Sequence, residues 1–373
     1  MNEFEQVGLN YRNWEGATAD ELGYLKRDGI YENSAKGPAG MHVERHFVEP
    51  LGNGQYINVF NADARPLNTS GERIGPTILK FQSHNYRIDE LSERKTQIHA
   101  HQAGARVLDI ELPGVTMDYQ DPKNTKGGFM TPLQFAQSFS GDFDALAHAQ
   151  LKAADQVVAF KDGDEIQAYG ESLGAYSAVA LARVLARGRF EKQLHISKMT
   201  LVEPVNGTAN RSIMNQLKMS TERLAKIEHY RRLVYLTENT TIGHPVTMFE
   251  MLNDQTAHID TALKSRIGQA VAAAASGAGL RKGLEGALWG ALANRSEIGP
   301  RLHEADITIA HGRESSVTLA KDLSNLADVA RERGVTVRLV EFGSSKENMM
   351  PAGHSQLDSL GRMAEAALYM ARR

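Results

Sequence analysis

The sequence predicts an α/β protein, with a mostly parallel central sheet that helices cover on both faces. Two observations lead to this fold class. Short β-favouring runs alternate with helical stretches along much of the 373-residue chain, a pattern typical of parallel sheets with crossover helices. The interval 207–302 breaks this alternation, because it reads as helical throughout. An all-helical insert between two sheet strands is best interpreted as a cap or lid.

The elements can be placed in order from the N-terminus. Residues 1–40 are polar and turn-rich and predict an N-terminal extension, with a helix near 19–27. The β-leaning runs Val43–Glu49 and Tyr56–Asn61 predict a hairpin, because a Gly-containing turn separates them. The following elements are expected as strand 77–81, helix 89–103, strand 105–110, helix 131–156, strand 165–169, helix 175–187 and strand 198–205.

The alternation resumes near the C-terminus and sets the domain boundaries. The expected elements are strand 306–310, helix 317–333, strand 335–342 and helix 356–372. The core domain is therefore expected to comprise residues 41–206 and 303–373. The lid, 207–302, lies between these two parts in the sequence.

Composition excludes several classes of function. The chain is 42% hydrophobic and 23% charged, as in soluble globular proteins, and its net charge of −3 disfavours nucleic acid as a main partner. It contains no cysteine, which excludes disulfides, thiolate metal sites and a cysteine nucleophile. No apolar run is long enough to predict a membrane span, and the first residues do not resemble a signal peptide. These features lead us to expect a cytoplasmic protein.

The motif that carries chemistry is Gly170-Glu-Ser-Leu-Gly174, a G-x-S-x-G sequence between an expected strand and an expected helix. A sharp strand-to-helix turn holds the central serine in a strained backbone conformation, which only very small neighbours tolerate. The hydroxyl of Ser172 is then expected to project above the sheet. The backbone N–H of Leu173 is expected to point to where an oxyanion forms.

With this motif in place, the chain after residue 41 resembles the α/β-hydrolase family, although no subfamily stands out. Residues Thr77–Phe81 are similar to the strand that precedes the family's oxyanion loop. The segment Gly104–Gly114 is similar to its next strand and D-x-P-G-type loop, with Glu111 where aspartate is usual. The helical insert falls where family members carry a lid.

The resemblance implies a triad in the chain order serine, acid, histidine. His354, in a loop between the last expected strand and helix, is the implied base. Glu314 is the implied acid, since Ile309–Val317 resembles the family's G-x-x-D-x-x-V stretch, one residue shorter and with glutamate for aspartate. Glu203, at the end of the preceding strand, is the alternative acid.

The resemblance also implies a second oxyanion donor after Thr77–Phe81. We expect the N–H of Ser83 or of a neighbour, Gln82 or His84, to donate, although the family's usual His-Gly is absent. His84 is alternatively a residue that lines the pocket.

No cofactor or metal is predicted. His42-Val-Glu-Arg-His46 differs from the H-E-x-x-H zinc motif in the place of its glutamate, and it lies in a β-leaning segment. The sequence also lacks a phosphate-binding glycine loop.

The implied function is a serine esterase that acts on a small, partly apolar acyl substrate. One alternative is an amidase, peptidase or acyltransferase that uses the same triad, and another is a non-catalytic binding or scaffold protein of this fold. Homo-oligomer formation is compatible with the sequence.

Overall fold

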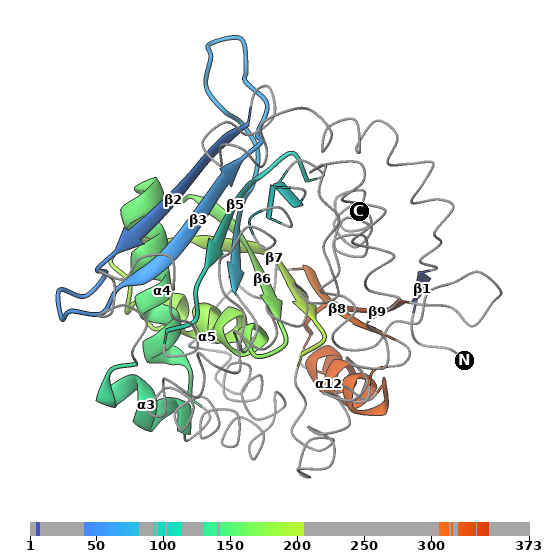
Figure 1. Cartoon of the computed structure of the whole chain (residues 1–373). Coiled ribbons are helices and arrows are strands. Elements are labelled where there is room, and N and C mark those ends of the chain that lie inside the picture. Colours follow the sequence, from blue (N-terminus) through green and yellow to red (C-terminus); the bar gives the residue numbers. More distant parts are fainter. Residues whose placement is uncertain are drawn as a thin grey trace, which may run out of the picture.

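A computed structural model of the chain defines the architecture (Figure 1). The structure describes residues 5–7, 41–81, 103–113, 130–139, 142–204, 306–312, 320–332 and 334–342, and the single residues 93, 96, 97, 99, 100 and 315. The expected lid, the expected helices 19–27 and 356–372, and several candidate site residues fall outside these ranges, so those expectations stay predictions.

The described strands form one nine-stranded sheet in the order β1-β9-β8-β7-β6-β4-β5-β3-β2 (Figure 1). Their bounds are β1 Glu5–Val7, β2 His42–Val48, β3 Ile57–Asp63, β4 Thr77–Phe81, β5 Arg106–Ile110, β6 Glu165–Glu171, β7 His195–Val202, β8 Asp306–Gly312 and β9 Val337–Phe342. All neighbours from β1 to β5 pair in parallel, whereas β3 and β2 are antiparallel additions at one edge. The expected hairpin is therefore confirmed.

Helices cover both faces of the sheet, as the sequence predicts. The named helices are α3 Pro132–Phe139, α4 Asp144–Val158, α5 Gly174–Ala186 and α12 Ala320–Glu332. Residues of α4, α5 and α12 pack with one face of the sheet in one buried cluster. Ala100 and Ala103, which belong to helical residues between 93 and 103, pack with the other face in a second cluster. The α/β fold class is confirmed by this layering.

Two expectations differ from the structure. The segment 131–156 is not one helix, because α3 ends at Phe139 and α4 begins at Asp144. The residue that precedes α4 is Phe143, and just before it the Oδ1 of Asp142 accepts the backbone N–H of Asp144 at 2.9 Å in a local turn. The sequence also gave no sign of β1, which extends the sheet by pairing in parallel with β9.

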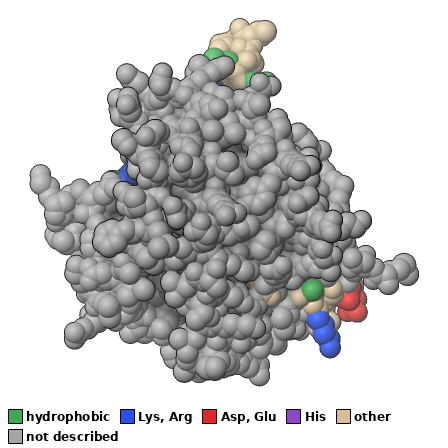
Figure 2. All heavy atoms as spheres, turned by 45° about the vertical axis from the view of Figure 1, so that its right-hand side comes forward, with side chains coloured by type: hydrophobic (Ala, Val, Ile, Leu, Met, Phe, Trp, Pro, Cys, Tyr) green, Lys and Arg blue, Asp and Glu red, His purple; other side chains and the backbone are tan. Residues whose placement is uncertain are grey.

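None of the described helices is both long and apolar enough to cross a membrane. The described loop between β3 and β4 projects from the sheet, and the space-filling view shows hydrophobic side chains near the base of the projection (Figures 1 and 2). This loop carries the exposed residues Leu67 and Ile74. Because this loop precedes β4, it lies at the amino ends of the parallel strands, opposite their carboxyl ends.

A fully buried ion pair lies between β4 and β5, on the face of the sheet against which Ala100 and Ala103 pack. Lys80 Nζ lies 3.3 Å from Asp109 Oδ2, and both side chains are 0% exposed. Thr96 completes the group, because its hydroxyl donates to Asp109 and lies 3.3 Å from Lys80 Nζ. The pair therefore joins two central strands to the helical residue Thr96.

Buried His99 makes the stability of the fold depend on pH. Its ring packs edge-on against Tyr169, with centroids 4.9 Å apart. Burial, together with the positive charges of Lys80 and Lys198, lowers the pKa of His99 to about 3. The unfolded chain, with a histidine pKa near 6.5, binds a proton between these two values that the folded chain does not bind. The free energy of unfolding therefore decreases as the pH falls from about 6.5 toward 3.

We predict that His99→Phe, which keeps a buried ring against Tyr169, removes this part of the pH dependence. Between pH 7.5 and 5, the wild type should lose about 2 kcal/mol more of its free energy of unfolding than the variant, from the shift in the histidine pKa. Urea unfolding at both pH values measures the difference. Equal losses in the two proteins would show that His99 does not carry the effect.

Candidate active site at the carboxyl ends of the parallel strands

Ser172 stands at a sharp turn between β6 and α5. Its φ is +49°, in the left-handed region that non-glycine residues rarely adopt. The Ser172 N–H donates to the carbonyl of Val202 at 2.9 Å, which extends the β6–β7 pairing to the turn itself. Its carbonyl then accepts the Ala175 N–H at 3.2 Å, which begins the turn of α5. The strained serine is therefore held by the strand on one side and by the helix on the other.

Gly170 permits the close approach of α5 to β6. A Cβ atom at this position would lie 2.7 Å from both the Cα of Ala175 and the carbonyl oxygen of Gly174. These neighbours are backbone atoms, so no side-chain movement can relieve the clash. Close contact with the backbone of α5 therefore requires glycine at position 170, as the motif predicts.

Leu173 caps the N-terminus of α5 and is buried, with 3% of its surface exposed. Its carbonyl accepts the Tyr176 N–H at 3.1 Å, within the first turn of the helix. Because backbone N–H groups and the helix dipole make a helix N-terminus favourable for negative charge, this is a suitable place to stabilise an oxyanion. The role of the Leu173 N–H as donor stays a prediction.

Glu203 follows the end of β7, the strand next to Ser172, and also has a positive φ, of +48°. Its N–H donates to the carbonyl of Ala310 at 2.7 Å, so its backbone joins β7 to β8. Its carboxylate accepts the N–H of Gly312 and, at 2.6 Å, the hydroxyl of Ser315. The side chain is buried, with 2% of the residue exposed. Glu203, the alternative acid, therefore lies directly after the strand that neighbours the sharp turn at Ser172, which we call the elbow.

Glu314, the acid that the sequence resemblance implies first, belongs to the segment that follows β8. The Ser315 N–H donates to the Gly312 carbonyl at 2.9 Å, so these two residues approach each other, with Arg313 and Glu314 between them in the sequence. The placement of Glu314 lies outside the described residues, as do the placements of His354, Ser83, Gln82 and His84. The structure thus brings Ser172, Leu173 and Glu203 together and does not test the other five.

Glu111, which stands where the family usually has aspartate, has a structural role. Its carboxylate accepts the Asn58 N–H at 3.1 Å, and its own N–H donates to the Asn58 carbonyl at 3.0 Å. Its carbonyl accepts the side-chain amide of Gln150 at 3.0 Å. It therefore ties the end of β5 to β3 and to α4.

His311 is a buried residue near the site that the sequence analysis did not select. It is 2% exposed, and its Nε2 lies 3.2 Å from Glu341 Oε2 on β9. It lies inside the stretch Ile309–Val317 that implied the acid, but that pattern singles out Glu314, and one histidine of 13 within an expected strand carries no signal of its own.

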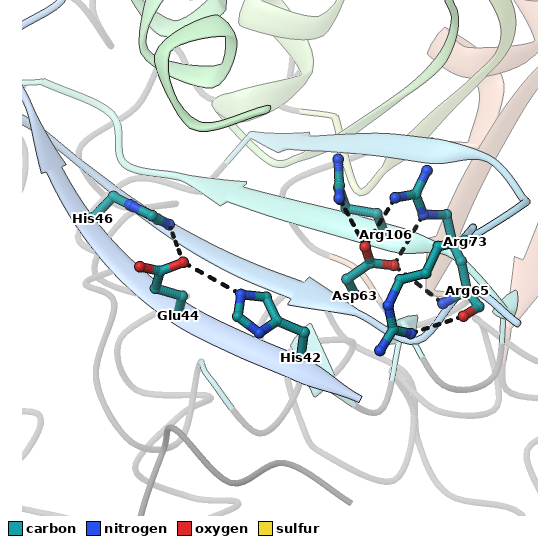
Figure 3. A network of polar contacts seen from close by, with 7 residues as sticks. All are labelled: His42, Glu44, His46, Asp63, Arg65, Arg73 and Arg106. Carbon is teal, nitrogen blue, oxygen red and sulfur yellow. Dashed lines mark hydrogen bonds and ion pairs between the residues drawn. The ribbon is translucent and has the colours of Figure 1, made fainter. Parts of the chain in front are cut away.

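The histidines of the rejected zinc motif share a face of β2 with Glu44 (Figure 3). Glu44 Oε2 lies 3.3 Å from His42 Nε2 and 3.2 Å from His46 Nε2, so the carboxylate bridges the two imidazoles on an edge strand. Among the described residues, no group of three or more His, Asp or Glu side chains is arranged to hold a metal ion. This cluster is therefore a polar edge of the sheet.

A second network in the same view surrounds Asp63 at the end of β3 (Figure 3). Arg65 and Arg106 both contact its carboxylate, with Arg65 Nη2 at 2.9 Å and Arg106 Nη2 at 2.8 Å. Burial raises the pKa of Asp63, but the hydrogen bond from Arg65 and the charge of Arg106 outweigh it, so the net pKa is lowered. The network fixes the start of the projecting loop and does not reach the elbow.

Comparisons with known proteins found no matching family model and no matching curated protein. Solved structures with a similar fold include a hyperthermophilic esterase from the archaeon Pyrobaculum calidifontis, with a TM-score of 0.48, 15% identity and coverage of 97% of this chain and 88% of that one. Brefeldin A esterase, described as a bacterial homologue of human hormone-sensitive lipase, gives a TM-score of 0.49 and 14% identity, over 98% of this chain and 85% of that one. The esterase LipW from Mycobacterium marinum gives a TM-score of 0.45 and 13% identity, over 98% of this chain and 92% of that one.

The architecture is established by this chain's own strand order. A parallel sheet carries an antiparallel pair at one edge, and the strained serine follows β6 in the middle of the sheet. The helix after that serine packs on the sheet with α4 beside it (Figure 1). The described part of the chain therefore has the α/β-hydrolase type of fold that the sequence predicts.

Proposed function

We propose that this protein is a serine hydrolase of the α/β-hydrolase family that cleaves carboxylic esters. The observation that carries the proposal is the backbone of Ser172, a non-glycine residue at φ +49° between a strand and the N-terminus of a helix. Such strain persists only where the surrounding structure enforces it, and it is concentrated at functional sites. Here it lifts a hydroxyl-bearing residue onto the carboxyl edge of the sheet, where ligands bind in open α/β folds.

In the proposed mechanism, Ser172 Oγ attacks the ester carbonyl carbon while His354 accepts its proton. The N–H of Leu173 and a second N–H near Ser83 stabilise the oxyanion of the tetrahedral intermediate. His354 returns the proton to the leaving alcohol, and an acyl group remains on Ser172. Water, activated by the same imidazole, then releases the acid.

The third member of the triad is a glutamate that orients the imidazole. Glu314 is the first choice from the sequence pattern, and Glu203 is the alternative. The substrate class that we propose is a small ester with a partly apolar acyl group, because the expected lid is rich in Ala, Leu and Met. Neither a metal nor a cofactor takes part in the proposed steps.

Covalent labelling tests the proposal without knowledge of the substrate. We expect a fluorophosphonate probe to modify Ser172 of the folded protein, with the site identified by peptide mass spectrometry. Ser197 is a suitable internal comparison, since it lies within β7, where its hydroxyl is 3.5 Å from the Ile166 carbonyl, and should stay unlabelled. A folded protein without label at Ser172 would favour the non-catalytic alternative.

A further inference from the structure

We propose that β2 is the interface of a homodimer, in which it pairs antiparallel with β2 of a second copy about a two-fold axis through Arg45. In this register Glu44 of each copy lies directly opposite His46 of the other. The pairing joins the two nine-stranded sheets into one continuous sheet. Assembly of this kind is independent of the proposed function.

The strand β2 is accessible at the outer edge of the sheet. It is the last strand in the sheet order, and among the described strands it pairs with β3 alone (Figure 1). The side chains of His42 and Glu44 are 57% and 52% exposed, so this part of the strand faces solvent. Since the outward N–H and carbonyl groups of an edge strand form a template for another strand, β2 can bind a copy of itself by backbone hydrogen bonds.

The length of β2 selects the register. A two-fold axis perpendicular to the sheet makes the two strands antiparallel, and it must pass through a residue, because facing side chains lie on the same face. β2 has seven residues, and its midpoint is Arg45. An axis through Arg45 therefore pairs the whole strand, with His42 opposite Val48, Val43 opposite Phe47 and Glu44 opposite His46. Moving the axis by one residue leaves only five of the seven residues paired.

The charges of β2 select the same register. With the axis at Arg45, a carboxylate faces an imidazole twice in the dimer. An axis through Glu44 places that carboxylate opposite its own copy, and an axis through His46 does the same with the imidazole. Facing side chains are close enough that opposite charges stabilise a pair of strands and like charges destabilise it. Strand length and charge pattern, two separate properties of β2, thus agree on one register.

Glu44 is already placed as a partner of imidazoles. Its Oε2 lies 3.3 Å from His42 Nε2 and 3.2 Å from His46 Nε2 of the same chain (Figure 3). Because an ionised carboxylate offers about four lone-pair positions, it can accept a further N–H from His46 of the second copy. A neutral imidazole donates this hydrogen bond, and a protonated one adds a charge to it.

The opposite face of β2 is compatible with this pairing. Arg45 faces its own copy at the axis, but its charge is neutralised within each chain, because its Nε donates to Glu93 Oε1 at 2.8 Å. Phe47 is 40% exposed, and in this register it lies opposite Val43 of the second copy. The dimer therefore covers part of an aromatic ring that the single chain exposes to water.

A strand that only protected the sheet edge would have a different composition. Protective edge strands commonly carry lysine or proline, which oppose pairing with another strand. The segment His42–Val48 contains neither, and its one glutamate lies two positions from a histidine on either side. Such a pattern is complementary to its own reverse, as a two-fold interface requires.

Charge exchange tests the interface and its register together. Glu44→Lys places a lysine opposite His46, and His46→Glu places a glutamate opposite Glu44, so each variant should repel its own copy. In an equimolar mixture the new lysine faces the new glutamate, and His46 of one chain faces Glu44 of the other. Only a register centred on Arg45 gives this restoration.

Analytical ultracentrifugation of the full chain measures the dissociation constants. We expect the wild type to be dimeric at about 50 μM and to dissociate on dilution, as small interfaces do. Each single variant should bind its own copy on the order of 100-fold more weakly, since two cross-strand pairs become repulsive, and the mixture should return to within about 10-fold of the wild type. The matched control is Glu165→Lys, the same change at an exposed residue of β6, which should keep the wild-type constant.

Three results would overturn the proposal. They are a monomeric wild type, dimers that survive unchanged in both single variants, and a mixture that stays as weakly associated as the single variants. The last result would mean that the register is wrong.

A disulfide tests the position of the axis, because the chain has no cysteine of its own. Facing residues have Cα atoms about 4.5–5.5 Å apart, within the range that a disulfide spans. Arg45→Cys, combined with Glu93→Gln so that no carboxylate is left buried without its partner, should form a covalent dimer with oxidised glutathione. Phe47→Cys is the control, since it faces Val43 and lies four positions, about 13 Å, from its own copy. If the charge variants do not fold, this pair decides, and crosslinking at 47 in equal yield, or none at 45, contradicts the proposal.

Discussion

Replacement of Ser172 with alanine is expected to lower kcat for an activated ester by on the order of 10⁶-fold, as loss of the nucleophile does in serine hydrolases. The free energy of unfolding should change by less than about 0.5 kcal/mol, because only a hydroxyl is removed and the backbone hydrogen bonds of Ser172 to Val202 and Ala175 are kept. The strain at φ +49° stays, since alanine bears a Cβ atom as serine does. Steady-state kinetics and urea unfolding of the purified variant measure the two quantities.

Ser172→Gly is the matched variant that tests the strain itself. Glycine adopts positive φ without steric cost, although its unfolded chain gains more conformational entropy. We expect Ser172→Gly to be as inactive as Ser172→Ala but more stable than it by about 1 kcal/mol, the order of the strain at such a residue. Retained turnover in either variant would remove Ser172 from the mechanism. Equal stability of the two would show that the strain does not exceed the cost of glycine's extra unfolded-state entropy.

The elbow could be predicted from the sequence because its requirements are local. Gly170, Ser172 and the start of α5 lie within a few residues of one another, and each is recognisable by type. The central strands were predictable for the same reason, since continuous apolar runs between turns are typical of a parallel sheet that is buried on both faces. The alternation of strands and helices then fixed the fold class.

The features that were missed depend on contacts between distant segments. β1 is three residues long, and only its pairing with β9 makes it a strand. Glu203 was named only as an alternative acid, and the contacts that bury its carboxylate come from groups more than 100 positions later, the Gly312 N–H and the Ser315 hydroxyl. At the break between α3 and α4, the Asp142 side chain accepts the backbone N–H of Asp144, a local bond that the helical spacing of apolar residues does not reveal.

Lys80→Met is expected to destabilise the fold by about 3–5 kcal/mol, because it leaves the carboxylate of Asp109 buried without its counter-ion. Both side chains are 0% exposed, and their contact of 3.3 Å lies on the face of the sheet against which Ala100 and Ala103 pack. The sequence Thr77–Phe81 gives no warning of this, since a lysine in a strand usually marks an exposed position. Urea unfolding at neutral pH measures the loss.

The double variant Lys80→Met/Asp109→Asn tests the cause. Asparagine is close in size to aspartate and can still accept the Thr96 hydroxyl, so removal of both charges leaves no unpaired ion in the core. We expect the double variant to be more stable than Lys80→Met alone, which is the sign of coupling within a buried pair. The comparison pair is Lys152 and Glu191, whose ion pair is at the surface, where Lys152→Met should cost no more than about 1 kcal/mol. A similar loss at both lysines would mean that the stem of Lys80, and not its charge, stabilises the sheet beneath the site.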